Sequence, residues 1–213
     1  MPSVVETDCR WRGGFCMEVA PPPNTVVIFG ARGDLAGRKL IFLDTPGHAN
    51  HHGCIYDERT RGFFTGDTFG ISYREFDNER GAMLFAPTTP VAFDPEAWQA
   101  SIDRLMSYAP EHMYLTHYSR LDNPAALAGD LRQSIRDLAD LALAEAGGSP
   151  EGRLERIRKA VGDYLVLRVH EHGCNLEESR VRELLALDTD LNAQGLEIWL
   201  TRRAKAASQA TTG

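Results

Sequence analysis

Three short polar motifs supply side chains that could hold a metal ion, and each motif follows an apolar run. They read D-T-P-G-H over 44–48, G-D-T over 66–68 and T-H-Y over 116–118, and they contain His48, Asp67 and His117. Imidazole nitrogen and carboxylate oxygen on loops at strand ends are typical ligands of catalytic zinc, and they also suit iron or manganese. One such residue alone is commonly a hydrogen-bonded loop residue. The three together predict a metal site.

Two further histidines, His51 and His52, lie close enough in sequence to His48 to be considered as substitute ligands. His52 is four residues after His48, a spacing that aligns side chains on a helix. This segment is expected to run from a loop into a strand, so the spacing does not bring the two rings together. The interpretation is that His51 and His52 lie at the surface or contact the ligand residues without binding the metal themselves.

Short apolar runs bounded by turns are expected to position these motifs. β-Branched and aromatic residues predict strands over 25–29, 40–43, 53–57, 62–65 and 112–116. Pro46 and Gly47 end the second of these strands abruptly. The connection over 69–94 is long for a compact domain, as loops that shape a functional site often are.

From Pro95 onward the hydrophobic period becomes helical. A first helix begins with Asp94 as its cap and Pro95 in its first turn. Apolar spacings of three and four predict further helices around 127–141, 154–165, 181–185 and 191–199. The chain is therefore expected to divide into a poorly ordered N-terminal segment (1–24), an αβ domain (25–122) and a helical appendage (123–213).

Composition and charge narrow the classes of partner. The 213 residues are 43% hydrophobic and 25% charged, which suffices for a buried core. A net charge of −7 argues against nucleic acid or an anionic membrane as a partner. No apolar run reaches the roughly 18 residues of a membrane span or forms a signal-peptide core, so a cytoplasmic protein is expected. The four cysteines form no C-x-x-C pair. They are expected to be free thiols, with a Cys9–Cys16 disulfide as the alternative.

The stretch from about 38 to 118 closely resembles the C-terminal half of the metallo-β-lactamase fold. The shared motifs are L-D-T-P-G-H (43–48), F-F-T-G-D-T (63–68), P-T-T-P (87–90) and Y-L-T-H-Y (114–118). The segment A-L-D-T-D-L-N-A-Q-G-L (186–196) is similar to a helical tail found on some bacterial members. The resemblance implies an α/β fold, an incomplete αβ/βα sandwich with a C-terminal helical appendage.

The same resemblance implies a site for two metal ions, with zinc as the first expectation and iron or manganese as alternatives. In the family, a histidine at the position of His48 completes the ligands of the first metal. An aspartate like Asp67 bridges the two metals, and a histidine like His117 binds the second. The implied activity is hydrolysis of an ester, thioester or amide bond in a small-molecule substrate by a metal-activated water.

The chain departs from the family at one motif. It contains no H-x-H-x-D-H, the cluster that gives the family four further ligands, and no histidine precedes His48. The three matching positions leave at most two protein ligands on any one metal, whereas zinc sites use at least three. The expectation is an abbreviated hydrolase-like protein whose activity depends on whether the reduced ligand set binds metal.

Two alternatives stay open. In the first, the chain is a non-catalytic αβ module, because half a sandwich leaves an apolar sheet face for a homodimer or another partner to cover. In the second, T-V-V-I-F-G-A-R-G-D-L (25–35) resembles the opening of glucose-6-phosphate dehydrogenase, and Gly30 to Leu35 would bind a nicotinamide nucleotide. A strand follows instead of the rest of a βαβ unit, which favours a hairpin between 26–29 and 39–43.

Overall fold

The computed structural model of the protein describes residues 39–89, 92–117 and 119–210. The segment 1–24, the strand expected over 25–29 and its hairpin with 39–43 lie outside these residues in whole or in part. The loop from Gly30 to Leu35 also lies outside them, so the nucleotide hypothesis is not tested by the fold.

Five strands form one mixed sheet in the order β1-β2-β3-β4-β5. They are β1 (Leu40–Asp44), β2 (Gly53–Asp57), β3 (Gly62–Gly66), β4 (His112–Leu115) and β5 (Ser119–Asp122). All neighbouring pairs are antiparallel except β3 and β4, which are parallel. Parallel neighbours need a long crossover, and residues 67–111 supply it. The four strands expected within this range are confirmed to within two residues, and β5 is an addition.

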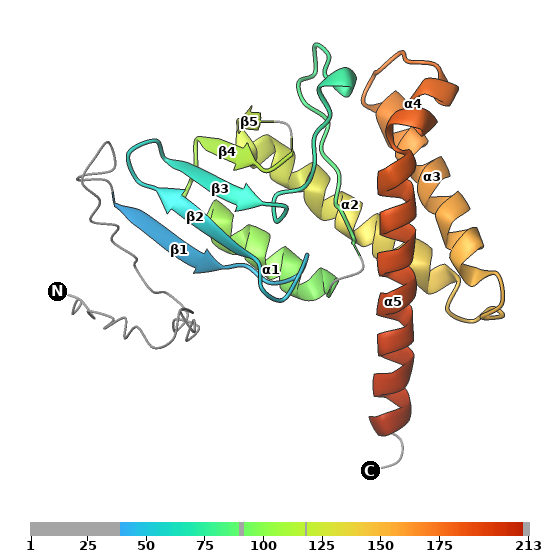
Figure 1. Cartoon of the computed structure of the whole chain (residues 1–213). Helices are drawn as coiled ribbons and strands as arrows, with labels where there is room; N and C mark the ends of the chain where they lie inside the picture. Colours follow the sequence, from blue (N-terminus) through green and yellow to red (C-terminus); the bar gives the residue numbers. More distant parts are fainter. Residues whose placement is uncertain (1–38, 90–91, 118, 211–213) are drawn as a thin grey trace, which may run out of the picture.

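The helices follow the apolar spacing of the sequence. They are α1 (Pro95–Met106), α2 (Pro124–Ala144), α3 (Arg153–Glu171), α4 (Glu178–Leu184) and α5 (Ala186–Ala210), with a 3-10 turn η1 (Arg74–Phe76). Asp94 caps α1 as expected, because its carboxylate accepts the Ala97 N–H. In Figure 1, α1 and α2 lie behind the sheet, and α3, α4 and α5 gather beside it. The mixed α/β class with C-terminal helices is therefore confirmed.

None of the helices within the described ranges combines the length and the apolar character needed to cross a membrane.

The two faces of the sheet differ in what they contact. Side chains that alternate toward the helices are buried: Leu43, Cys54, Tyr56, Phe63, Met113 and Leu121. The alternate positions form an apolar stripe of paired residues across four strands: Phe42, Ile55, Phe64 and Tyr114. Phe64 is 48% exposed, and its ring stacks on Tyr114 with centroids 4.9 Å apart. One face is therefore core, and the other presents aromatic surface.

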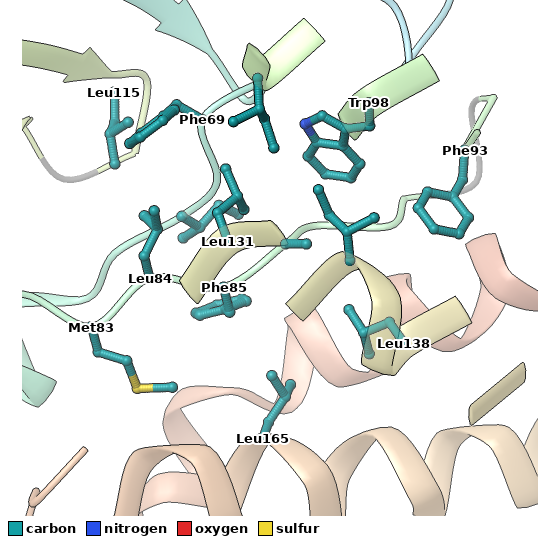
Figure 2. Close-up of a cluster of buried hydrophobic side chains, with 14 of the residues drawn as sticks. Phe69, Met83, Leu84, Phe85, Phe93, Trp98, Leu115, Leu131, Leu138 and Leu165 are labelled. Atoms are coloured by element: carbon teal, nitrogen blue, oxygen red, sulfur yellow. The ribbon is translucent and has the colours of Figure 1, made fainter. Parts of the chain in front are cut away.

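One hydrophobic core continues from the sheet into the C-terminal helices. Figure 2 shows Phe85 from the β3–α1 loop, Leu131 from α2 and Leu165 from α3 in one buried cluster. Leu196 and Trp199 of α5 belong to the same core. The long loop is thus packed between the sheet and the appendage. The division of the chain near residue 122 stays a prediction.

Candidate metal centre

His48 lies in a tight turn between β1 and β2 that α1 holds in place. Gly47, with φ +128°, precedes it, and a Cβ at Gly47 would lie 2.3 Å from the Trp98 backbone nitrogen. Only glycine fits this conformation and this close approach. The Ser101 hydroxyl donates to the Pro46 carbonyl at 2.7 Å, and the Asp94 N–H donates to the Gly47 carbonyl at 2.8 Å. These contacts fix the backbone from which His48 projects.

The tautomer of His48 follows from its one strong hydrogen bond. Nδ1 lies 2.7 Å from the Pro87 carbonyl oxygen, and a carbonyl can only accept. Nδ1 therefore carries the proton, and the lone pair of Nε2 is left to bind a metal. His48 is 3% exposed, and this burial lowers its pKa. A neutral imidazole whose other nitrogen is held by a carbonyl is the usual state of a metal-binding histidine.

Asp67, in the turn after β3, lies between His48 and His117. Its Oδ2 is 3.7 Å from His48 Nε2, and its Oδ1 is 3.5 Å from His117 Nε2. Two ligands of one tetrahedral zinc ion lie roughly 3.3–3.6 Å apart, so both distances are close to that range. Within the described ranges, the buried Oδ1 atom accepts no hydrogen bond. Such an orphaned carboxylate oxygen is costly unless a cation compensates it, which fits a metal ligand.

His52 joins this group, although its spacing from His48 argued against it. The two rings are 4.6 Å apart, and ligand atoms of His48, His52 and Asp67 all lie within 4.8 Å of one another. A turn brings them together, because the Thr45 N–H donates to the His52 carbonyl at 2.9 Å. The sequence signal that could have found His52 is the short loop between two antiparallel strands. Burial lowers its pKa, which favours the neutral ring.

His117 occupies a different position from the other three residues. It follows β4, its side chain is 51% exposed, and it approaches the Oδ1 side of Asp67. It is not among the three residues whose ligand atoms cluster within 4.8 Å. Tyr118, the last residue of the T-H-Y motif, lies outside the described residues. His48 and His117 therefore both lie beside Asp67 but next to different oxygens of its carboxylate, and the role of the three residues as ligands stays a prediction.

Buried hydroxyl groups and an indole support the Asp67 turn from below. Trp98 Nε1 donates to the Thr68 carbonyl at 2.7 Å. The Thr68 hydroxyl lies 3.2 Å from the Thr45 hydroxyl, which lies 3.3 Å from Cys54 Sγ. Burial raises the pKa of the Cys54 thiol to about 11. Cys54 is therefore a protonated member of this support, not a nucleophile.

We expect iodoacetamide to leave Cys54 unmodified in the folded protein. A thiol with a pKa of about 11 is only roughly 0.1% thiolate near pH 8, and Cys54 has no exposed surface. Peptide mass spectrometry after timed alkylation measures this, and the protein in urea, where Cys54 should react fully, is the control. Stoichiometric modification of Cys54 in the folded state would contradict the structure.

Helix α5 places a carboxyl group near the same centre. The Tyr73 hydroxyl donates to Asp188 Oδ2 at 2.6 Å. Burial raises the pKa of Asp188, and the charge of His117 acts in the opposite direction. The sequence pattern gives Asp188 only a place on a helix, because its partner Tyr73 is 115 residues away.

Replacing Asp188 with asparagine is expected to stabilise the protein at neutral pH. A carboxyl group whose pKa is raised on folding takes up protons in the folded state, so it lowers stability as pH rises above its unfolded pKa near 4. Asparagine keeps an acceptor for Tyr73 and removes this cost. Urea denaturation as a function of pH should show the gain above about pH 5 and its loss near pH 3. A variant less stable than the wild type at neutral pH would count against the buried, unfavourable charge.

Residues 8–117, slightly more than half of the chain, match the family model of the metallo-beta-lactamase superfamily. The metallo-beta-lactamase fold-containing protein ST1585 of Sulfurisphaera tokodaii is 28% identical over 102 residues, which are 48% of this chain and 35% of that protein.

Two solved structures are similar in part. The archaeal superfamily protein ST1585 from Sulfolobus tokodaii gives a TM-score of 0.45 at 20% identity, covering 77% of this chain and 48% of its own. The family protein TTHA1429 from Thermus thermophilus gives 0.36 at 18% identity, covering 84% and 48%. The chain thus spans between about a third and a half of the length of the proteins that it matches.

Proposed function

This chain belongs to the metallo-beta-lactamase superfamily, and on that premise we propose that it is a metal-dependent hydrolase with a reduced ligand set. His48, His52 and Asp67 would hold the ion. His117 lies beside Asp67 Oδ1, where it would bind a second ion, as the family pattern implies. Two imidazoles and one carboxylate are a ligand set of catalytic zinc, with the fourth position open. Iron and manganese accept the same atoms.

The observation that carries this proposal is the buried Oδ1 of Asp67, which lacks a hydrogen-bond donor among the described residues. His48 Nε2 and His117 Nε2 flank the two oxygens of the same carboxylate at 3.7 and 3.5 Å. When bound, the metal would lower the pKa of a water molecule and polarise the carbonyl group of an ester, thioester or amide. His48 and His52 contribute neutral rings, and the α1 contacts hold the His48 turn rigid.

The direct test is the metal content and hydrolytic activity of the whole chain. After loading with zinc and dialysis, we expect about one equivalent of zinc by mass spectrometry. Less than about a tenth of an equivalent, after separate loading with zinc, iron and manganese, would overturn the metal centre. Hydrolysis of small thioester, ester and amide substrates should disappear with a chelator and return with zinc. Bound zinc without turnover of any of these classes would leave a metal site and overturn the hydrolase.

A second candidate function concerns the exposed sheet face. We propose that a second copy of this chain packs on the stripe formed by Phe42, Ile55, Phe64 and Tyr114. Two sheets pack face to face through apolar stripes of this kind. The charges at its rim are compensated within each chain, with Lys39 paired to Glu58 at 2.5 Å and Arg120 to Asp122 at 3.1 Å.

For this interface, Phe64→Lys is expected to convert a dimer into a monomer. The ring of Phe64 lies at the centre of the stripe, and a buried ammonium group would be left without a partner. Sedimentation equilibrium measures the mass, and Leu187→Lys is the matched control because Leu187 is also an exposed apolar residue but belongs to α5 and not to the stripe. A wild-type chain that stays monomeric at about 100 µM would contradict the proposal.

A further inference from the structure

We propose that helix α5 positions His48 for metal binding by clamping the peptide group between Pro87 and Thr88. Asn192 holds this peptide group, and Gly195 lets α5 lie against the next peptide group, between Thr88 and Thr89. The two residues together form the clamp. The inference rests on the proposed metal site, but its structural part concerns His48 alone and is testable without metal. It also gives a role to the 186–196 motif, which the metal ligands themselves do not use.

The first contact of the clamp is a hydrogen bond to the backbone. The Thr88 N–H donates to Asn192 Oδ1 at 2.5 Å. The Thr88 hydroxyl donates to the Asn192 carbonyl at 3.2 Å and lies 3.1 Å from Asn192 Oδ1. Thr88 has no exposed surface, and Asn192 is 1% exposed. Asn192 therefore holds both the backbone and the side chain of Thr88.

The second contact is a close approach of two backbones. A Cβ at Gly195 would lie 1.5 Å from the Thr88 carbonyl oxygen. Any residue other than glycine would push α5 away from the loop. Glycine inside a helix costs about 1 kcal/mol relative to alanine. Gly195 therefore lowers the stability of α5 but allows its close contact with the Thr88 backbone. The loop residue Thr88 is thus held against α5 on its carbonyl side as well.

The clamp reaches His48 through one planar peptide group. The Pro87 carbonyl and the Thr88 N–H are the two ends of the same peptide unit, which is rigid. This unit is trans, since the described residues contain no cis peptide bond. One end accepts the Nδ1 proton of His48 at 2.7 Å, and the other end donates to Asn192. The orientation of the carbonyl that selects the His48 tautomer is therefore fixed by α5, and the two hydrogen bonds polarise each other.

Packing alone does not account for Asn192. Its Nδ2 atom is buried and has no hydrogen-bond partner among the residues that the structure describes. A buried donor left unpaired is unfavourable, and an apolar residue of the same size would avoid that cost. What asparagine adds over leucine is the acceptor Oδ1, and that atom is the one that holds the peptide group.

The test measures the His48 tautomer on the full chain without metal and then the zinc affinity of the same proteins. We expect the wild type to show His48 protonated on Nδ1 in two-bond 1H–15N correlation spectra at neutral pH. Asn192→Ala should shift His48 toward the Nε2–H tautomer and lower zinc affinity about 10-fold to 100-fold. Asn192→Asp retains the acceptor and should restore the wild-type tautomer. Leu196→Ala truncates a buried residue of the same helix whose aliphatic side chain cannot hydrogen-bond, so it should leave the tautomer and the affinity unchanged.

Each outcome decides a separate point. An Asn192→Ala protein with the wild-type tautomer and affinity would overturn the clamp, even if the wild type binds zinc. An equal change in Leu196→Ala would also overturn it, because general loosening of α5 would then suffice. A wild type that binds no zinc, with a tautomer that changes in Asn192→Ala, would overturn the metal function and leave the positioning role standing. If Asn192→Ala does not fold, Asn192→Leu fills the space and makes the same comparison.

Discussion

Replacing Asp67 with alanine is expected to lower zinc affinity by at least about 100-fold while leaving the metal-free fold as stable as before. Asp67 is flanked by both His48 and His117. Loss of a group that only supports a ligand costs up to about 100-fold, so loss of the shared ligand should cost at least that much. The fold should not suffer, because Oδ1 is buried without a hydrogen bond among the described residues and its removal relieves a cost.

Competition with a coloured chelator measures the affinity, and thermal melts in excess chelator measure the metal-free stability. Asp122→Ala is the matched control, since this exposed carboxylate pairs with His112 at 2.7 Å and lies outside the cluster. It should bind zinc as the wild type does. An Asp67→Ala protein with zinc affinity within about 3-fold of the wild type would remove Asp67 from the centre.

Gly47→Ala is expected to lower the free energy of unfolding by roughly 3–5 kcal/mol and to abolish metal binding with it. Two effects add at this position. The backbone has φ +128°, which L-residues rarely adopt, and the new Cβ would lie 2.3 Å from the backbone of Trp98. Either the His48 turn or the first turn of α1 must move, and both hold the site.

Gly81→Ala separates the two effects. Gly81 has φ +103°, but nothing lies within 4 Å of an added Cβ there, so this variant carries backbone strain without a clash. It should lose only about 1–2 kcal/mol. Urea denaturation of both variants measures the difference. Equal losses would show that the contact between Gly47 and Trp98 relaxes freely and does not fix the turn.

The sequence predicts the elements that are determined by neighbouring residues better than those determined by contacts between distant residues. Local hydrophobic periodicity and the residues that begin and end elements predict the strands at 40–43 and 62–65 and the helix from Pro95. The structure confirms all three. Strand β5 escapes this reasoning because it has four residues, and Leu121 is its one apolar side chain. Its place is fixed by pairing with β4 and not by its own pattern.

The residues of the candidate site also fall into those that sequence motifs predict and those that only long-range contacts reveal. Family motifs identify His48, Asp67 and His117, and the structure brings the three together. The four-residue spacing of His48 and His52 does not predict their contact outside a helix, whereas the turn between β1 and β2 brings the two rings within 4.6 Å. Asp188 and Asn192 contact loop residues 115 and 104 positions away, and a helical period carries no information about which distant loop a face will meet. Such contacts need a structure.

The contact between Thr88 and Asn192 also orders events in time. The two residues are 104 positions apart, so the loop behind His48 closes only after the residues between them have been made. Contacts of such long range form slowly, because the entropy of closing the intervening chain is lost before the contact stabilises anything. During synthesis, Asn192 emerges 104 residues after Thr88. A nascent chain would therefore expose His48, His52 and Asp67 before Asn192 could arrange the loop behind His48, and the proposed metal binding would follow that contact.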